Sequence, residues 1–307
     1  MAWMPDAVVI GTPKCGSTSI FDWLGQYEGV ALARNKETYF LSDEHNPDYT
    51  SITRRHSIHT EGIEGYRSAW DADDPTLVHI EATPTYLYDT EPREVLAEAD
   101  ACQLIAVIRA PEDRIRSVFD YVQGSMGIIP ASMSFHEFVT TAQAGGFNGK
   151  WSSILNGVLR HSAYATYLRP WCNDIAASRL TVLLLEDLSA NPESHVRSLA
   201  STLGVPGAAT APLDFTPSNQ SGARSAWQPM ERAVAAIGRM DIAGRIPRGT
   251  RESMKSLVRR VTPQRDSSLS EQDLETYAAL RDHFEAPNAE LRELLPDLPW
   301  HHWEPSP

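Results

Sequence analysis

One stretch near the N-terminus, Ala7 to Leu24, most constrains what this chain can fold into. Four apolar residues, Ala7 to Ile10, predict a buried β-strand, and a loop rich in glycine, proline, serine and threonine follows at once. Apolar residues then recur at helical spacing: Ile20, Phe21, Leu24 and Tyr27. A strand, a tight loop and a helix in this order favour an anion, because free N–H groups and the helix dipole both attract negative charge.

The lysine of this loop is not where ATP hydrolysis needs it. Gly11 and Gly16 have the spacing of a nucleotide-hydrolysing P-loop, but Ser17 stands at the lysine position of that motif. Lys14 lies inside the loop instead. Taken alone, the stretch is equally compatible with an ordinary strand–turn–helix corner that carries a solvated lysine.

Composition limits the partners and the compartment. The chain has 307 residues and a net charge of -13, which argues against a nucleic-acid binder, because such proteins displace phosphate counterions with Lys and Arg. Its three cysteines, Cys15, Cys102 and Cys172, have neither metal-ligand nor redox spacing, and are expected to be reduced thiols. The N-terminus lacks the pattern of a secretory signal and no apolar run is long enough to span a bilayer, so we expect a cytoplasmic protein.

A second strand-to-helix junction lies a hundred residues further on. Gln103 to Ile108 predicts a buried parallel strand, and Pro111 suits the first turn of the next helix. Arg109 and Ser117, eight residues apart, are within reach of one anion, and the guanidinium of an arginine binds phosphate in a bidentate manner. The alternative is a salt-bridged helix, in which Glu112 and Asp113 pair with neighbouring arginines.

Strands and helices alternate along most of the chain. This alternation predicts an α/β fold with a P-loop-like central parallel sheet flanked by helices on both faces. We expect one domain over 1–307. The predicted strands are Ala7 to Ile10, Leu77 to Glu81, Gln103 to Ile108 and Leu180 to Leu185. The principal later helices are predicted at Glu91 to Ala99, Phe135 to Ala144, from His161, Glu193 to Leu203, Ser270 to Phe284 and Ala289 to Leu295.

Two further segments carry candidate site residues. Glu37 lies between a basic residue and two aromatic residues, Tyr39 and Phe40, which suits a general base whose pKa is tuned by its neighbours. An exposed loop glutamate is the alternative. Thr83 and Tyr86 follow the strand that ends at Glu81, where ligands bind in α/β sheets, although simple turn chemistry also explains Thr83. Histidines 45, 56 and 59 lack ligand spacing and are expected to be surface residues.

Together, the two junctions resemble a known family. PKCGST and RAPEDRIRSVFDY, each between a strand and a helix and in this order, are similar to the two signatures of sulfotransferases that use 3′-phosphoadenosine 5′-phosphosulfate (PAPS). The most similar branch contains the heparan sulfate sulfotransferases and bacterial relatives. NKETYF, EATPTY and the final LPDLPWHHW also resemble segments of that branch.

The resemblance implies an activity and a role for each residue. The enzyme would transfer a sulfuryl group from PAPS to a hydroxyl or amine, leaving 3′-phosphoadenosine 5′-phosphate (PAP), with Lys14 stabilising the leaving phosphate, Glu37 acting as base, and no metal. The implied nucleotide-binding residues are Pro13, Lys14, Cys15, Gly16, Ser17, Thr18, Arg109, Ser117, Ser221, Gly222 and Arg224. The candidate acceptor-binding residues are Tyr39, Phe40, Thr83, Tyr86 and Tyr164.

Departures from the branch leave the acceptor open. Thr18 stands where the branch often has arginine and Ala82 where it has lysine, so we do not expect the acceptor to bind as it does in that branch. For an acidic protein without a secretory signal, we expect a small-molecule, glycan or lipid acceptor rather than a heparin-like polymer. A P-loop nucleotide kinase and a catalytically silent PAP- or PAPS-binding module are the alternatives. The 231–267 segment has nine basic and four acidic residues, a net of +5, and is expected to be a helical insertion or lid, or a surface for membrane lipid. Nothing in the sequence indicates the oligomeric state.

Overall fold

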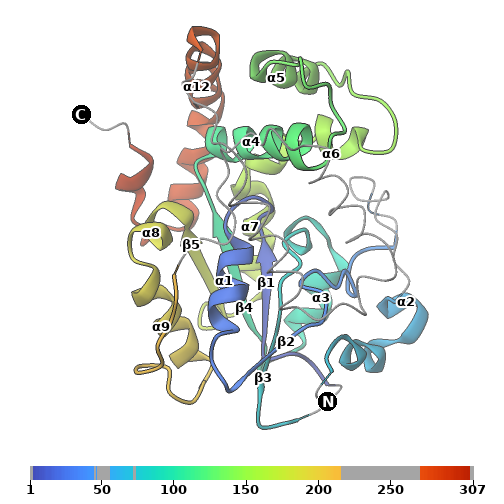
Figure 1. The fold of residues 1–307 in the computed structure, drawn as a ribbon, viewed down its shortest axis with the longest axis vertical. Coiled ribbons are helices and arrows are strands. Elements are labelled where there is room, and N and C mark those ends of the chain that lie inside the picture. Colours follow the sequence, from blue (N-terminus) through green and yellow to red (C-terminus); the bar gives the residue numbers. More distant parts are fainter. Residues whose placement is uncertain (1–2, 45, 47–55, 72–73, 216–269, 305–307) are drawn as a thin grey trace, which may run out of the picture. The chain divides into compact units, whose positions relative to one another are not determined.

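A parallel five-stranded sheet in the order β2-β3-β1-β4-β5 organises the described part of the chain (Figure 1). The computed structural model describes residues 3–44, 46, 56–71, 74–215 and 270–304. The strands are β1 (Ala7–Gly11), β2 (Val30–Leu32), β3 (Val78–Glu81), β4 (Gln103–Ile108) and β5 (Leu180–Leu184). The four predicted strands are confirmed, each within one residue of its predicted ends. The three-residue β2 was not predicted as a strand, because it is too short to give a pattern of its own.

The helices follow the predicted alternation. The α-helices are α1 (Ser17–Leu24), α2 (Ile58–Glu61), α3 (Glu91–Ala97), α4 (Pro111–Asp120), α5 (Phe135–Gln143), α6 (Ser152–Asn156), α7 (Tyr164–Asp174), α8 (Leu185–Ala190), α9 (Pro192–Thr202) and α12 (Glu271–Leu294). The remaining helical segments are the 3-10 helices η1 (Ile63–Ala69), η2 (Tyr86–Tyr88), η4 (Arg160–Ser162) and η6 (Trp300–Trp303) and the π-helical segment η3 (Tyr121–Ser125).

Three helical predictions need correction. The first helix ends at Leu24, before Tyr27, because Gly25 caps it. Residues after β5 form α8, which was not predicted as a helix. The two helices predicted around Pro287 are one, α12, with the proline inside it. Leu280, Phe284 and Leu291 are all buried along this helix, and their burial offsets the hydrogen bond that a proline removes.

Contacts along the chain divide it into two compact units. The first comprises Met1–Pro111, Arg160–Asn219 and His283–Pro307, and the second Glu112–Leu159 and Gln220–Asp282. The sheet belongs to the first unit, and alternate residues of its strands face opposite sides. Val8 and Ile10 of β1 belong to one core cluster, with side chains of α3 and α7, whereas Ala7 and Val9 belong to another, with side chains of α1 and α9. Helices therefore cover both faces of the sheet, as predicted.

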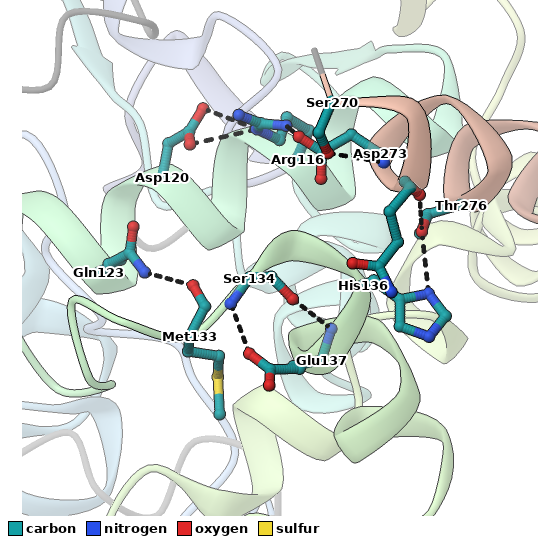
Figure 2. A network of polar contacts seen from close by, with 11 residues as sticks. Arg116, Asp120, Gln123, Met133, Ser134, His136, Glu137, Ser270, Asp273 and Thr276 are labelled. Carbon is teal, nitrogen blue, oxygen red and sulfur yellow. Dashed lines mark hydrogen bonds and ion pairs between the residues drawn. The ribbon is translucent and has the colours of Figure 1, made fainter.

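The second unit holds α4 and the start of α12 together by polar contacts (Figure 2). Arg116 lies 3.2 Å from Asp120 on its own helix and 3.3 Å from Asp273. His136 Nδ1 lies 3.1 Å from the hydroxyl of Thr276. Ser134 caps α5, accepting a hydrogen bond of 3.1 Å from the backbone N–H of Glu137.

The order of the strands predicts where a ligand binds. The chain leaves β1 toward β2 and β3 on one side, and then crosses to β4 on the other. In open parallel sheets, ligands bind beyond the carboxyl ends of the strands at the point where the direction of winding changes. That point lies at the ends of β1 and β4, and these are the strands that precede the two candidate anion loops.

Candidate active site

The loop between β1 and α1 has a backbone suited to an anion. Lys14 and Gly16 have φ angles of 70° and 95°, in the left-handed region, so the loop reverses direction within a few residues. A Cβ on Gly16 would lie 2.7 Å from Cδ1 of Leu185, so the end of that side chain would have to move to make room for it. Thr12 fixes the base of the loop, with its N–H donating to the carbonyl of Val107 on β4 at 2.7 Å.

Lys14 lies half-buried among other charged groups. Burial lowers the pKa of Lys14 to about 8, and the positive charges of Lys36 and Arg109 act in the same direction. The negative charge of Glu37 raises this pKa only slightly. The structure thus brings together three predicted site residues, Lys14, Glu37 and Arg109. The cations outnumber the carboxylates, so this end of the sheet favours an anionic ligand.

Lys36 is a site residue that the sequence predictions missed. Its ammonium group donates to the hydroxyls of Ser17, at 3.1 Å, and Thr18, at 3.0 Å, which are both predicted nucleotide contacts. It also lies 3.3 Å from a carboxylate oxygen of Glu37. The signal was present in the sequence as the basic residue before Glu37, but only the fold shows that this segment returns to the first loop.

Glu37 is held in place on both sides along the chain. The backbone N–H of Ala82, just after β3, donates to the carbonyl of Lys36 at 2.9 Å. The N–H of Thr38 donates to the hydroxyl of Thr83 at 3.0 Å. The hydroxyl of Tyr39 donates to the second carboxylate oxygen of Glu37. The segment that presents this carboxylate is therefore anchored to the end of β3.

A second carboxylate, Glu81, supports this anchor and was also missed. It is fully buried at the end of β3 and accepts hydrogen bonds from the hydroxyls of Thr83, at 2.6 Å, and Thr38, at 2.9 Å, and from Tyr66. Burial raises the pKa of Glu81, against the effect of these donors. The first letter of the EATPTY segment was its only signal in the sequence.

The five predicted acceptor-binding residues all lie in the first unit, but they differ in exposure. Phe40 is buried and stacks on Tyr66 with ring centroids 4.8 Å apart. Thr83, Tyr86 and Tyr164 are buried, and each forms hydrogen bonds within the protein. Tyr39 alone among the five is half-buried rather than buried. Acceptor binding by these residues remains a prediction.

The other predicted residues have the following places. Pro13 is half-buried in the first loop, and Cys15 is buried with its sulfur 2.6 Å from the hydroxyl of Thr12. Ser117 is buried in α4 and belongs to the second unit. Residues Ser221, Gly222 and Arg224 and the basic 231–267 segment lie outside the described residues.

Comparison with known proteins decides the family. The model of the sulfotransferase domain matches residues 4–215, which include both anion loops and all five strands. The chain belongs to the sulfotransferase domain family. This confirms the resemblance drawn from PKCGST and RAPEDRIRSVFDY. A sulfotransferase structure from Alicyclobacillus acidocaldarius, 19% identical, covers 80% of this chain and all of that chain with a TM-score of 0.55, which supports the fold.

Curated relatives of this chain carry heparan sulfate in their names. Mouse heparan sulfate glucosamine 3-O-sulfotransferase 3B1 is 24% identical over 204 residues, which are 66% of this chain and 46% of that protein. The mouse bifunctional heparan sulfate N-deacetylase/N-sulfotransferase 1 is 22% identical over 95% of this chain and 29% of its own length. The chain thus spans about half or less of the length of these relatives.

Two absences concern only the residues that the structure describes. Within them, no helix is both long and apolar enough to cross a membrane. The same residues contain no group of three or more His, Cys, Asp or Glu side chains arranged to hold a metal ion.

Proposed function

We propose that this protein is a PAPS-dependent sulfotransferase that transfers the sulfuryl group to a hydroxyl or amine of a small-molecule, glycan or lipid acceptor. The observation that carries the proposal is the position of Lys36. Its ammonium group contacts the hydroxyls of Ser17 and Thr18 and also the carboxylate of Glu37. The side chain of Lys36 therefore links Glu37, the candidate base, to the candidate phosphate loop.

The residues present fit a donor with phosphates at both ends of its ribose. The N–H groups and hydroxyls of Gly16, Ser17 and Thr18 bind the 5′-phosphate at the start of α1. Arg109, at the end of β4, binds the 3′-phosphate with Ser117, which enters the proposal on its sequence spacing alone. The 3′-phosphate distinguishes PAPS from ATP, so these two residues set the choice of nucleotide.

Two cations and one carboxylate carry the chemistry. Lys14 and Lys36 stabilise the negative charge that develops on the leaving phosphate, an effect that is strong where water is excluded. Glu37 accepts the proton of the attacking hydroxyl or amine, and the Tyr39 hydroxyl orients the Glu37 carboxylate. The acceptor approaches from the Glu37 side, where Tyr39 is half-buried.

Binding and transfer experiments test this function directly. We expect the purified protein to bind PAP more tightly than ADP or ATP, without a requirement for Mg²⁺, because Arg109 and Ser117 recognise the 3′-phosphate. Incubation with PAPS carrying labelled sulfate and a panel of metabolites, glycans and lipids should then give a labelled product, detected by mass. A preference for ATP that depends on Mg²⁺ would favour the kinase alternative. PAP binding without transfer to any class of acceptor would favour the silent binding module.

A further inference from the structure

The peptide group between Arg109 and Ala110 is held from both edges. The hydroxyl of Tyr164 donates to the carbonyl oxygen of Arg109 at 2.9 Å. The N–H of Ala110 donates to a carboxylate oxygen of Glu186 at 3.0 Å. This carbonyl and this N–H belong to one planar peptide unit, so bonds at both of them fix its orientation. They therefore fix the direction in which the Arg109 side chain leaves the backbone.

Strand register explains why Glu186 reaches this peptide. Ile108 is the register partner of Leu184 where β4 and β5 end side by side. Ala110 lies two residues beyond Ile108, and Glu186 lies two residues beyond Leu184, in the first turn of α8. A carboxylate at that position accepts the N–H that β4 leaves without a strand partner, and a charged acceptor makes this hydrogen bond a strong one.

The C-terminal turn completes the arrangement. The indole N–H of Trp303, in η6, donates to the second carboxylate oxygen of Glu186 at 3.0 Å. His302 Nε2 lies 3.4 Å from the carboxylate of Asp187, the residue after Glu186. The rings of Trp303 and Tyr164 have their centroids 6.3 Å apart. Residues more than a hundred positions apart in the sequence thus meet around one peptide group.

The same tyrosine also reaches the first anion loop. The hydroxyl of Tyr164 lies 3.8 Å from the sulfur of Cys15, next to Lys14 in the sequence. Tyr164 is buried, with 1% of its surface exposed. It therefore contacts both strand-end loops from within the core.

We infer that Tyr164, Glu186 and Trp303 are positioning residues for Arg109, and that the C-terminal turn thereby contributes to recognition of the 3′-phosphate. The inference rests on the proposed function, in which Arg109 binds that phosphate. The effect of Glu186 and Trp303 should be specific for nucleotides with a 3′-phosphate, because neither is assigned a nucleotide contact of its own. Tyr164 also contacts Cys15 of the first anion loop, so its effect should be larger for nucleotides with a 3′-phosphate but not confined to them.

Conservative variants and two nucleotides test this inference. Tyr164→Phe, Glu186→Gln and Trp303→Phe each remove a donor or a charge. The first two keep the shape of the side chain, and Trp303→Phe puts a smaller aromatic ring in place of the indole. We expect each to weaken PAP binding about tenfold, the scale of a lost hydrogen bond to a charged or preorganised group, as measured by titration calorimetry. Binding of adenosine 5′-monophosphate, which lacks the 3′-phosphate, should change less than twofold in Glu186→Gln and Trp303→Phe, and less than PAP binding in Tyr164→Phe. In an Arg109→Ala background, none of the three substitutions should weaken PAP binding further.

Matched controls come from the same chain. The indole of Trp70 donates to the carbonyl of Ala31 at 3.1 Å, so Trp70→Phe removes an indole donor without touching the Arg109 peptide and should leave PAP binding unchanged. Tyr27 is a buried tyrosine whose hydroxyl donates to the carbonyl of Ala208 at 3.0 Å, and Tyr27→Phe serves as the control for Tyr164→Phe.

The remaining outcomes would contradict the inference alone or the inference together with the proposed function. Equal weakening of both nucleotides by the three variants would assign them a merely structural role, and unchanged PAP binding would also overturn the inference. If Arg109→Ala lowers PAP affinity but the three variants do not, the proposed function survives without the inference. A wild-type protein that does not prefer PAP to adenosine 5′-monophosphate would overturn both.

Discussion

The ammonium group of Lys36 lies 3.3 Å from the carboxylate of Glu37, its neighbour in the sequence. Consecutive residues seldom face each other unless the backbone between them is constrained. Here the constraint comes from the two residues that follow β3: the N–H of Ala82 donates to the carbonyl of Lys36, and the hydroxyl of Thr83 accepts from the N–H of Thr38. The result is a pair of opposite charges beside the first anion loop.

Replacing Lys36 should slow the transfer step. We expect Lys36→Met to lower kcat roughly 10²-fold, because it removes a cation that stabilises the leaving phosphate and orients Glu37. Steady-state kinetics with PAPS and an acceptor measure the effect. Lys150→Met is the control, because Lys150 lies over the ring of Trp151 in the second unit. Unchanged kcat in Lys36→Met would contradict the assignment.

Replacing Glu37 should separate chemistry from binding. Glu37→Gln keeps the shape of the side chain but cannot accept a proton, so kcat should fall roughly 10²-fold or more. Affinity for PAP should stay within a few-fold of wild type, because the carboxylate is on the acceptor side. Full activity on the true acceptor would show that another group is the base.

The lowered pKa of Lys14 predicts a pH dependence of PAP binding. Lys14 has a pKa of about 8 in the free protein, and a bound anion raises it, so binding takes up a proton above that pH. Affinity for PAP should therefore fall as the pH rises from about 8 toward 10. The opposite sign holds for the contribution of Lys14 to the free energy of unfolding. The free energy of unfolding rises over this pH range, because the unfolded chain binds the proton of Lys14 more tightly than the folded protein does.

Lys14→Arg is the control for this pH dependence. Arginine stays charged throughout the range, so any affinity that the variant retains should be flat between about pH 8 and 10. Calorimetric titrations at several pH values compare the two proteins. A wild-type affinity independent of pH above 8 would argue against a role for the Lys14 charge in binding.

Adding one methyl group to the first loop should disrupt it. Gly16→Ala places a Cβ 2.7 Å from Leu185 and strains a φ of 95°, so we expect a loss of about 1–3 kcal/mol in the free energy of unfolding and weaker PAP binding. Gly204→Ala is matched to it, because Gly204 has a φ of 66° with no atom within 4 Å of the added Cβ. A similar loss of PAP affinity in both variants would remove the argument for close packing at Gly16.

The buried carboxylate of Glu81 predicts a second pH effect, on stability. Glu81→Gln leaves hydroxyl donors of Thr38, Thr83 and Tyr66 with fewer acceptors, which should cost about 1–3 kcal/mol at acidic pH. The pKa of Glu81 is raised in the folded protein, so its contribution is largest at low pH and is lost as the pH rises through that value. The difference between variant and wild type in urea unfolding should accordingly shrink from pH 4.5 upward. A constant difference would contradict the raised pKa.

The elements that define the nucleotide side could be predicted from the sequence. The strands β1 and β4 lie buried at the centre of the sheet, so both faces must be apolar and their sequences are continuous hydrophobic runs. Turn chemistry then marks where each strand ends, which is how Lys14 and Arg109 were found. The same reasoning missed β2, because three half-buried residues give neither a run nor an alternation.

The site residues that the sequence did not predict have one property in common. Their contacts depend on how two strands pair, or on segments distant in the sequence that the fold brings together. Lys36 contacts hydroxyls that are 18 and 19 positions away, and Glu186 meets Ala110 only because β4 and β5 pair as they do. Local pattern carries no information on either contact. The proline of α12 misleads in the other direction, since tertiary burial keeps this helix continuous through Pro287.

The place of β1 in the middle of the sheet also bears on how the acceptor could change over evolution. Its amides bond to neighbours on both sides, and they should exchange with deuterium only when the whole unit unfolds. The first anion loop follows directly from this strand, whereas Glu37 lies in a loop that is attached to the end of β3 by a few hydrogen bonds. Changes in the acceptor loops should therefore have little effect on the stability of the strand and loop that we propose bind the nucleotide.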